Sequence, residues 1–148
     1  RGGSLSRVAR MSNDEEARYV ADKIFHILDQ HELSRRTPKV LLLGVSYKAN
    51  SKDARNSPAF AIESVLRPQV WVQFHDPYIA DFNSVDQWWE AADGCDAIVF
   101  LQAHAPYLSP PWKALRDRMA SLIALDATAR ICPPPHPWTF WQIGEEYG

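Results

Sequence analysis

Cysteine, net charge and long apolar runs are all scarce in this 148-residue chain. The two cysteines, Cys95 and Cys132, are too few for a disulfide framework and lack metal-site spacing, so we predict reduced thiols, a cytoplasmic location and no metal. Sixteen basic against eighteen acidic residues leave a net charge of -2, which gives no electrostatic reason to expect a nucleic acid or an anionic membrane as partner. No apolar run approaches the ~18–20 residues of a membrane span. We therefore expect a compact soluble domain with its own core.

Glycine is also missing where a dinucleotide-binding turn would need it. A buried-type strand at 39–43 runs into Gly44, and no second glycine follows before Pro58. The G-x-G-x-x-G fingerprint is therefore absent, and without it the backbone cannot approach a pyrophosphate closely. We predict no catalytic residue either, because Cys95 has no cation near it in the sequence to lower its pKa and Cys132 lies in a proline cluster.

After residue 38, short apolar strands alternate with helical segments. The expected strands are 39–43, 70–74, 97–101 and 122–126, and the expected helices are 57–66, 85–92, 111–119 and a short closing helix from Thr139. This alternation implies right-handed βαβ crossovers and a sheet covered on both faces. The predicted fold is α/β, a Rossmann-like three-layer domain with a mostly parallel sheet.

An amphipathic helix is predicted ahead of this pattern, at 13–28. Ser12 or Asn13 is suited to cap it, and three acidic residues in its first turn favour the helix dipole. Val20 and Ile24 belong to its apolar stripe.

The loop after the first strand carries three cations, Lys48, Lys52 and Arg55, immediately before a helix start. This arrangement suits phosphate, because a helix N-terminus presents free N–H groups and favours negative charge. The alternative is that the cations pair with Asp53 or keep a surface loop solvated, and spacing alone favours this alternative. Ligands in such sheets bind outside the carboxyl ends of the strands. Three loops lie there: 46–56, 75–82 and 102–110.

His104 and Asp76 stand at two of these strand ends and invite a catalytic interpretation, since histidine titrates near neutral pH. We instead interpret His104 as a loop residue that caps or orients neighbouring backbone. Asp76 is interpreted as a turn former before Pro77.

The run from Gly44 to Ala59, GVSYKANSKDARNSPA, closely resembles the G-x-x-[YF]-K-x-x-[ST]-x-D-x-R-x-S-P-[AS] signature of nucleotide-sugar dehydrogenases. These are the UDP-glucose, UDP-N-acetylmannosamine and GDP-mannose dehydrogenases, and the signature opens their C-terminal, nucleotide-sugar-binding domain. Further matches follow in the family's order: HDPY at 75–78, an A-x-x-x-D-A-x-V pattern at 92–99, and H-x-x-[FY] at 104–107. The resemblance covers about residues 39–130.

This resemblance implies binding roles for four residues. Tyr47 and Lys48 match the family's aromatic–Lys pair, which contacts the nucleotide-sugar. Arg55 matches the arginine that reaches NAD, a cofactor bound mainly by the family's N-terminal domain. The family ends its fourth strand with D-x-R, but Thr128 stands at that arginine position here. We predict that Arg130 replaces the missing arginine in substrate binding, provided that the loop is shifted.

The resemblance also implies part of an enzyme. Family members oxidise the sugar C6 alcohol to a carboxylate in two NAD-dependent hydride transfers, through a thiol in a G-x-C-[FLV]-P motif that this chain lacks. We expect residues 1–35 to be the tail of a central dimerisation and connecting helix. Residues 36–148 would then be the UDP-sugar-binding domain, inactive alone and partnered by an N-terminal catalytic domain in a homodimer that serves polysaccharide biosynthesis.

The alternative is a non-catalytic interaction or regulatory module that kept the fold and lost the ligand. Thr128 in place of arginine favours this alternative. In that case Trp138, Phe140 and Trp141 near the C-terminus would form an interface patch and not part of the core.

Overall fold

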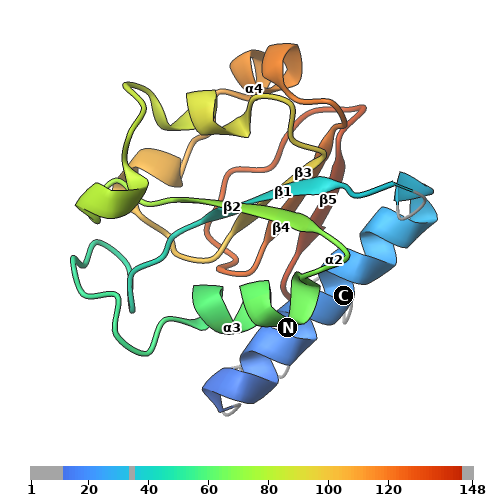
Figure 1. The fold of residues 1–148 in the computed structure, drawn as a ribbon. Coiled ribbons are helices and arrows are strands. Elements are labelled where there is room, and N and C mark those ends of the chain that lie inside the picture. Colours follow the sequence, from blue (N-terminus) through green and yellow to red (C-terminus); the bar gives the residue numbers. More distant parts are fainter. Residues whose placement is uncertain (1–11, 34–35, 145–148) are drawn as a thin grey trace.

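Five parallel strands form one sheet in the computed structural model, which describes residues 12–33 and 36–144 (Figure 1). The strands are β1 (Lys39–Leu43), β2 (Trp71–His75), β3 (Ala97–Phe100), β4 (Ile123–Asp126) and β5 (Thr139–Gln142). Their order across the sheet is β2-β1-β3-β4-β5, and every neighbouring pair is parallel. The predicted α/β fold with a mostly parallel sheet is therefore confirmed.

The fifth strand corrects one prediction, since a closing helix from Thr139 was expected. That helix is wrong: β5 pairs with β4 in register from Ile123↔Thr139 onward. Threonine and aromatic residues suit a pleated surface, and the backbone groups of β4 need partners on their outer side. Phe140 and Trp141 pack against opposite faces of the sheet. The half-buried aromatic residues of β5 therefore pack against the core on both faces, and the interface patch stays a prediction.

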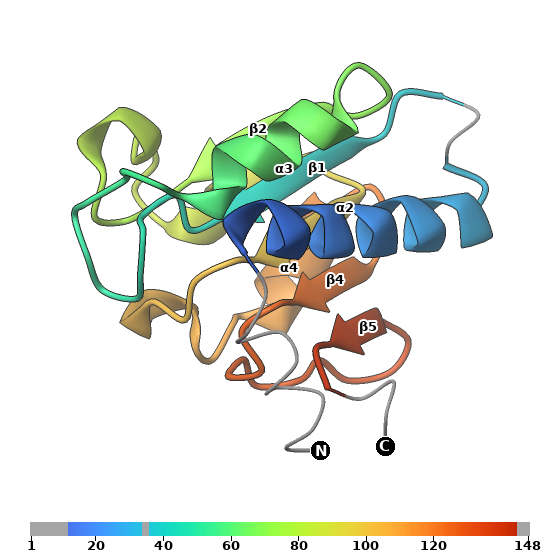
Figure 2. The same ribbon diagram turned by 90° about the horizontal axis from the view of Figure 1, so that it is seen from below.

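Helices cover both faces of the sheet, so the domain has the three layers that were predicted (Figures 1 and 2). On one face α2 (Asn13–Gln30) and α3 (Pro58–Leu66) lie side by side, and on the other lie η3 (Trp88–Ala92) and α4 (Trp112–Arg118). Two short 3₁₀ turns, η2 (Ala80–Phe82) and η4 (Ala105–Tyr107), follow the ends of β2 and β3. No helix in the described ranges is long and apolar enough to cross a membrane.

The two faces of the sheet bury two separate clusters, and β1 contributes to both. Successive side chains of a strand point to opposite faces. Val40 and Leu42 therefore pack with α2 and α3, whereas Leu41 and Leu43 pack with η3 and α4. All four side chains are fully buried, so β1 lies at the centre of the domain.

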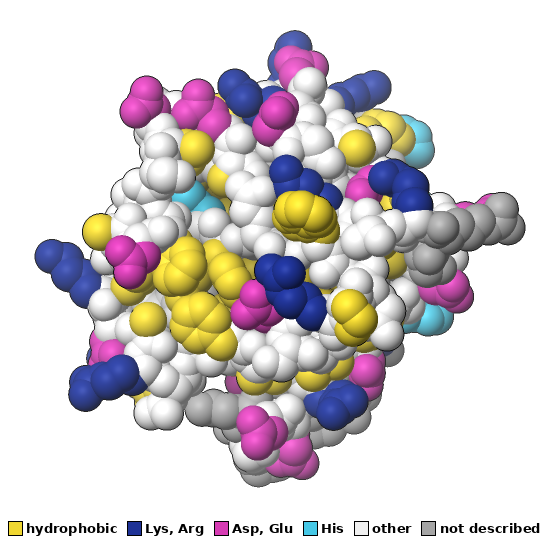
Figure 3. All heavy atoms as spheres, viewed as in Figure 1, with side chains coloured by type: hydrophobic (Ala, Val, Ile, Leu, Met, Phe, Trp, Pro, Cys, Tyr) yellow, Lys and Arg dark blue, Asp and Glu magenta, His cyan; other side chains and the backbone are white. Residues whose placement is uncertain are grey.

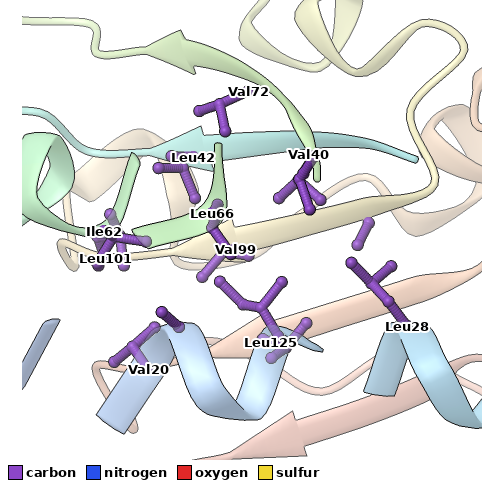
Figure 4. Packing of buried hydrophobic residues seen from close by; sticks show 14 of the residues in the cluster. Val20, Leu28, Val40, Leu42, Ile62, Leu66, Val72, Val99, Leu101 and Leu125 are labelled. Atoms are coloured by element: carbon purple, nitrogen blue, oxygen red, sulfur yellow. The ribbon is translucent and has the colours of Figure 1, made fainter. Parts of the chain in front are cut away.

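Helix α2 belongs to the same core as the sheet. Ser12, one of the two predicted caps, starts it and forms a capping box with Glu15: the Glu15 N–H donates to Ser12 Oγ at 3.2 Å, and the Ser12 N–H donates to Glu15 Oε1 at 3.0 Å. Its apolar side, including Val20 and Leu28, faces Leu125 of β4 (Figure 4). The domain boundary between residues 35 and 36 stays a prediction, but the described part of this helix packs into the domain that follows it.

The outer strand β2 and helix α3 carry an exposed apolar surface (Figure 3). Trp71 is 64% exposed and Phe60 is 38% exposed. The rings of Phe60, Phe74 and Phe82 contact one another, with centroids 5.4 to 6.1 Å apart. The Asp76 N–H donates to the carbonyl of Phe82 at 3.0 Å. The turn after β2 is therefore joined to this ring cluster through Phe82.

Candidate functional site

The carboxyl ends of β1, β3 and β4 meet at one edge of the sheet. β2 lies on one side of β1 in the sheet, and β3 lies on the other side. The order of strands therefore reverses at β1, and the connections that leave β1 and β3 run to opposite sides. In sheets of this order, ligands bind in the crevice at such a switch point. Gly44 allows the loop after β1 to lie close to the loop after β3: its φ is +108°, and a Cβ at this position would lie 2.8 Å from Gln102.

A pocket of about 300 Å³ opens at this edge, and we call it the edge pocket. Its wall comes from the first turn of α2, the loop and helix start after β1, and the loops after β3 and β4. The lining residues are Glu16, Tyr47, Ala49, Asn56, Pro58, Leu101, Gln102, Ala103, Ala127, Thr128 and Arg130. The wall is mostly polar, with charged, amide and hydroxyl groups beside small apolar side chains. Polar groups that converge on one pocket fix the orientation of a small molecule.

The structure brings together two of the four residues predicted to bind ligands. Tyr47 and Arg130 both line the edge pocket. Lys48 does not line it; its side chain is exposed, and its carbonyl accepts the Ser46 hydroxyl at 2.9 Å. Arg55 also lies outside the lining, on the exposed part of the same loop. The binding roles of all four residues stay predictions.

Arg55 makes the ion pair that the sequence left open. Its Nε and Nη2 donate to the two carboxylate oxygens of Asp53 at 3.0 and 2.9 Å. These hydrogen bonds from Arg55 lower the pKa of Asp53 to about 2. The Arg55 side chain is 87% exposed, so the pair shapes the loop at the surface and does not close the pocket.

The loop after β4 explains how Thr128 and Arg130 come to share one wall. The Thr128 hydroxyl and N–H both donate to Asp126 Oδ1, at 2.6 and 2.8 Å, and the Arg130 N–H donates to Thr128 Oγ1 at 3.1 Å. Ala129 between them has a φ of +65°. Thr128, at the position of the family's arginine, therefore holds the turn of this loop through its hydrogen bonds. The arginine that lines the pocket is Arg130, two positions later.

Sequence reasoning missed three polar lining residues: Glu16, Asn56 and Gln102. Gln102 Nε2 donates to the Tyr47 carbonyl at 3.3 Å, which links the loops after β3 and β1. Glu16 had been interpreted only as a charge that favours the helix dipole. No local pattern marks it as a pocket residue, because its position depends on how α2 packs across the sheet.

Burial of the half-buried Glu16 raises the pKa of its carboxyl above the ordinary value. A raised folded-state pKa means that the folded chain loses stability as pH rises from the unfolded pKa through the folded one. We therefore expect Glu16→Gln to raise the melting temperature at pH 7, with a gain that shrinks below pH 4.5. Thermal denaturation at both pH values measures this difference.

Glu15 provides a control of opposite sign. The backbone and side-chain bonds with Ser12 lower its pKa, so the charged form stabilises the folded state above the unfolded pKa. Glu15→Gln should lower the melting temperature at pH 7 and lose this effect in acid. Equal changes in melting temperature for both variants would contradict the inference that burial in the pocket wall disfavours the charged form of Glu16.

Asp76 and His104 orient backbone, as predicted, and lie buried next to the pocket loops. Asp76 accepts the N–H groups of Val45 and Ser46 on one oxygen and that of Tyr78 on the other. Burial alone would raise the pKa of Asp76, but the bonds from His104 and these N–H groups outweigh it and hold the pKa below its usual range. This carboxylate is therefore a fixed structural anion.

Cys95 is buried on the side of the sheet that faces η3. Burial raises the pKa of its thiol to about 12, so the group stays protonated near neutral pH. Across residues 12–33 and 36–144, no group of three histidine, cysteine or acidic side chains is placed to hold a metal ion.

The sheet order, the switch point and the edge pocket define a doubly wound α/β domain of the Rossmann-like class. The family model described as the UDP-glucose/GDP-mannose dehydrogenase family, UDP binding domain, matches residues 41–132. The chain belongs to this family.

Curated relatives and solved structures agree with this assignment. UDP-N-acetyl-D-mannosamine dehydrogenase from Pyrococcus horikoshii is 30% identical over 141 residues, which cover 95% of this chain and 33% of the relative. The enzyme of the same name from Methanocaldococcus jannaschii is 37% identical over 112 residues, covering 72% of this chain and 24% of the relative. The structure of UDP-D-ManNAc dehydrogenase from Pyrococcus horikoshii matches with a TM-score of 0.78 at 28% identity, over 87% of this chain and 31% of that one. The chain thus spans about a quarter to a third of the length of these relatives.

Proposed function

We propose that the edge pocket binds the nucleotide part of a UDP-sugar, and that this chain is the UDP-sugar-binding part of an NAD-dependent nucleotide-sugar 6-dehydrogenase. The observation that carries the proposal is the meeting of Tyr47 and Arg130, from loops far apart in the sequence, in one pocket at the switch point. A guanidinium binds phosphate oxygens through two parallel N–H bonds, and a tyrosine ring offers an apolar face with a polar tip.

The polar wall supports a ligand that carries hydroxyl groups as well as phosphate. Glu16, Gln102 and Thr128 bring acceptors and donors to the pocket. The names of the relatives support a UDP-N-acetylmannosamine-type substrate, oxidised at its C6 alcohol to the uronate. Within this proposal Lys48 contacts the same ligand from the rim.

NAD is the cofactor that the family implies, and the described residues around Gly44 do not form a dinucleotide-binding turn for it. Gln102 occupies the space next to Gly44, so a pyrophosphate has no room to lie against the backbone there. We assign no hydride step to the described residues. Arg55, exposed beyond its pair with Asp53, is proposed to reach NAD held by another part of the protein.

The greater length of the relatives supports a catalytic domain outside this chain. We propose that this domain supplies the cofactor site and the thiol, and that the chain alone does not turn over. A homodimer formed through the helix that includes residues 1–35 and a cytoplasmic location complete the proposal.

Replacing Arg130 with alanine tests the site. If the guanidinium binds phosphate, Arg130→Ala should weaken UDP binding about ten- to hundredfold, since a charge-assisted bond contributes about 1.5–3 kcal/mol. Isothermal titration of the 148-residue chain with UDP measures the effect. Lys48→Ala should weaken binding in the same direction and by less, because its side chain lies outside the pocket lining.

Arg116→Ala is the matched control, since this arginine is exposed on α4, on the opposite face of the sheet from α2 and α3. It should leave the affinity unchanged. Equal losses for Arg116→Ala and Arg130→Ala would reveal a general charge effect and contradict the site.

A second candidate is the non-catalytic module that kept the fold and lost the ligand. The observation that favours it is the Thr128 side chain, which is committed to Asp126 at the family's arginine position. This candidate predicts no heat of UDP binding in the same titration, with the chain still folded.

A further inference from the structure

Beside the edge pocket, three loops are tied together by two fully buried polar side chains, Asp76 and His104. Asp76 directly follows β2, and His104 lies in the loop after β3. Both bond to the segment that follows β1, residues 46–50, which includes the pocket residue Tyr47.

His104 holds this segment at both of its ends. Its Nδ1 accepts the N–H of Asn50 at 2.8 Å, while its Nε2 lies 2.9 Å from Asp76 Oδ2 and 3.0 Å from Ser46 Oγ. Because Nδ1 accepts a hydrogen bond, the ring proton lies on Nε2 and points toward these two oxygens. The Ser46 hydroxyl in turn donates to the carbonyl of Lys48 at 2.9 Å.

Asn50 completes the link from the other side. Its Oδ1 accepts the N–H of Ala105 at 3.0 Å and the hydroxyl of Tyr78 at 2.9 Å. Its φ of +56° lies in the left-handed region, which asparagine adopts more readily than most other residues, and these bonds support the turn. Residues 46–50 are therefore shaped by groups from the ends of β2 and β3, on either side of β1.

We propose that His104 is a positioning residue: its imidazole, with Nδ1 unprotonated, holds residues 46–50 in the conformation that places Tyr47 on the pocket wall, and so sets the pocket's affinity for a nucleoside diphosphate. The inference rests on the proposed function for its ligand. His104 itself is buried and is not part of the pocket lining. It acts through the Asn50 N–H and not by contact with the ligand.

Two substitutions separate the two ring nitrogens. A glutamine at 104 can reach Asp76 with an amide donor but leaves the Asn50 N–H without an acceptor. An asparagine places its amide oxygen near the Nδ1 position and keeps that acceptor. We expect His104→Gln to weaken UDP binding about tenfold, and His104→Asn to stay within about threefold of the original chain.

Tyr107→Phe is the control for a merely structural effect. The Tyr107 hydroxyl is buried and bonds to His75: it donates to the His75 carbonyl at 3.0 Å and lies 2.8 Å from His75 Nδ1. It makes no bond to residues 46–50. Its loss should lower the melting temperature without changing the affinity for UDP. A Tyr107→Phe affinity that falls as far as that of His104→Gln would overturn the proposal.

Amide hydrogen exchange followed by NMR gives a readout that needs no ligand. The Asn50 amide should be protected in the original chain and in His104→Asn, and should exchange about tenfold faster or more in His104→Gln. Fast exchange of this amide in the original chain would overturn the inference. If the original chain binds no UDP, the proposed function fails, while the exchange experiment still decides whether His104 positions the segment.

Asn50→Gly keeps the test open if His104→Gln does not fold. Glycine tolerates the positive φ and retains the backbone N–H, but it removes the acceptor for Ala105 and Tyr78. Because the N–H at position 50 can still donate to His104 Nδ1, the variant should fold and bind UDP within about threefold of the original chain. A loss of about tenfold or more would assign the shape of the segment to Asn50 Oδ1 and count against positioning by His104.

Discussion

Replacing Gly44 with alanine should lower the free energy of unfolding by about 3 kcal/mol, from a positive-φ strain of about 1–2 kcal/mol and a steric overlap of similar size. The φ of Gly44 is +108°, and the new Cβ would lie 2.8 Å from both Cβ and the backbone N of Gln102. The backbone N cannot move away by rotating a side chain, so β1 and the loop after β3 have to separate. Urea denaturation measures the loss, and UDP titration should show weaker binding, because Gln102 lines the pocket.

Gly94→Ala separates strain from overlap. Gly94 also has a positive φ, +73°, but nothing lies within 4 Å of the position where its Cβ would stand. This variant should lose only the strain, about 1 kcal/mol. Equal losses for the two variants would show that the contact between Gly44 and Gln102 does not constrain the switch point.

Replacing Ile24 with alanine should lower the free energy of unfolding by about 2–5 kcal/mol, the range for truncating a fully buried aliphatic side chain. Ile24 is 0% exposed and belongs to the cluster between α2, α3 and the sheet. Urea denaturation of the whole chain should show a single transition that moves to lower urea. That result would make α2 an integral part of the domain and not only a connecting segment.

Asp22→Ala on the same helix is the control, because this side chain is exposed. Its effect should stay within about 0.5 kcal/mol. A similarly small loss for Ile24→Ala would mean that the sheet is stable without α2, in agreement with the predicted boundary between residues 35 and 36.

Most of the fold could be predicted from the chain, because strand and helix periods are local. Four of the five strands and helices α2, α3 and α4 were predicted to within about two residues. The segment from Thr139 was assigned wrongly, since four residues after a proline cluster carry too little pattern to separate a strand from a short helix. The segment forms a strand because its backbone pairs with the otherwise unpaired side of β4.

The candidate site was predicted less completely. Tyr47 and Arg130 line the edge pocket, whereas Lys48 and Arg55 lie outside its lining. Lys48 directly follows Tyr47 in the sequence, yet the bonds of Ser46 and Asn50 give the two side chains different positions. Spacing cannot supply that information, because the partners that impose the turn come from other strands.

The alternation of short apolar strands with helices, the positions of the loops at their carboxyl ends and the signature from Gly44 to Ala59 are properties of the sequence. They determine a parallel sheet, the edge at which a ligand site is expected and the family. The tertiary structure alone decides which loops meet there, because that depends on the strand order β2-β1-β3-β4-β5 and on the packing of α2. It brings Glu16 and Arg130 into one pocket and bonds the buried His104 to Ser46 and Asn50, which no local pattern indicates.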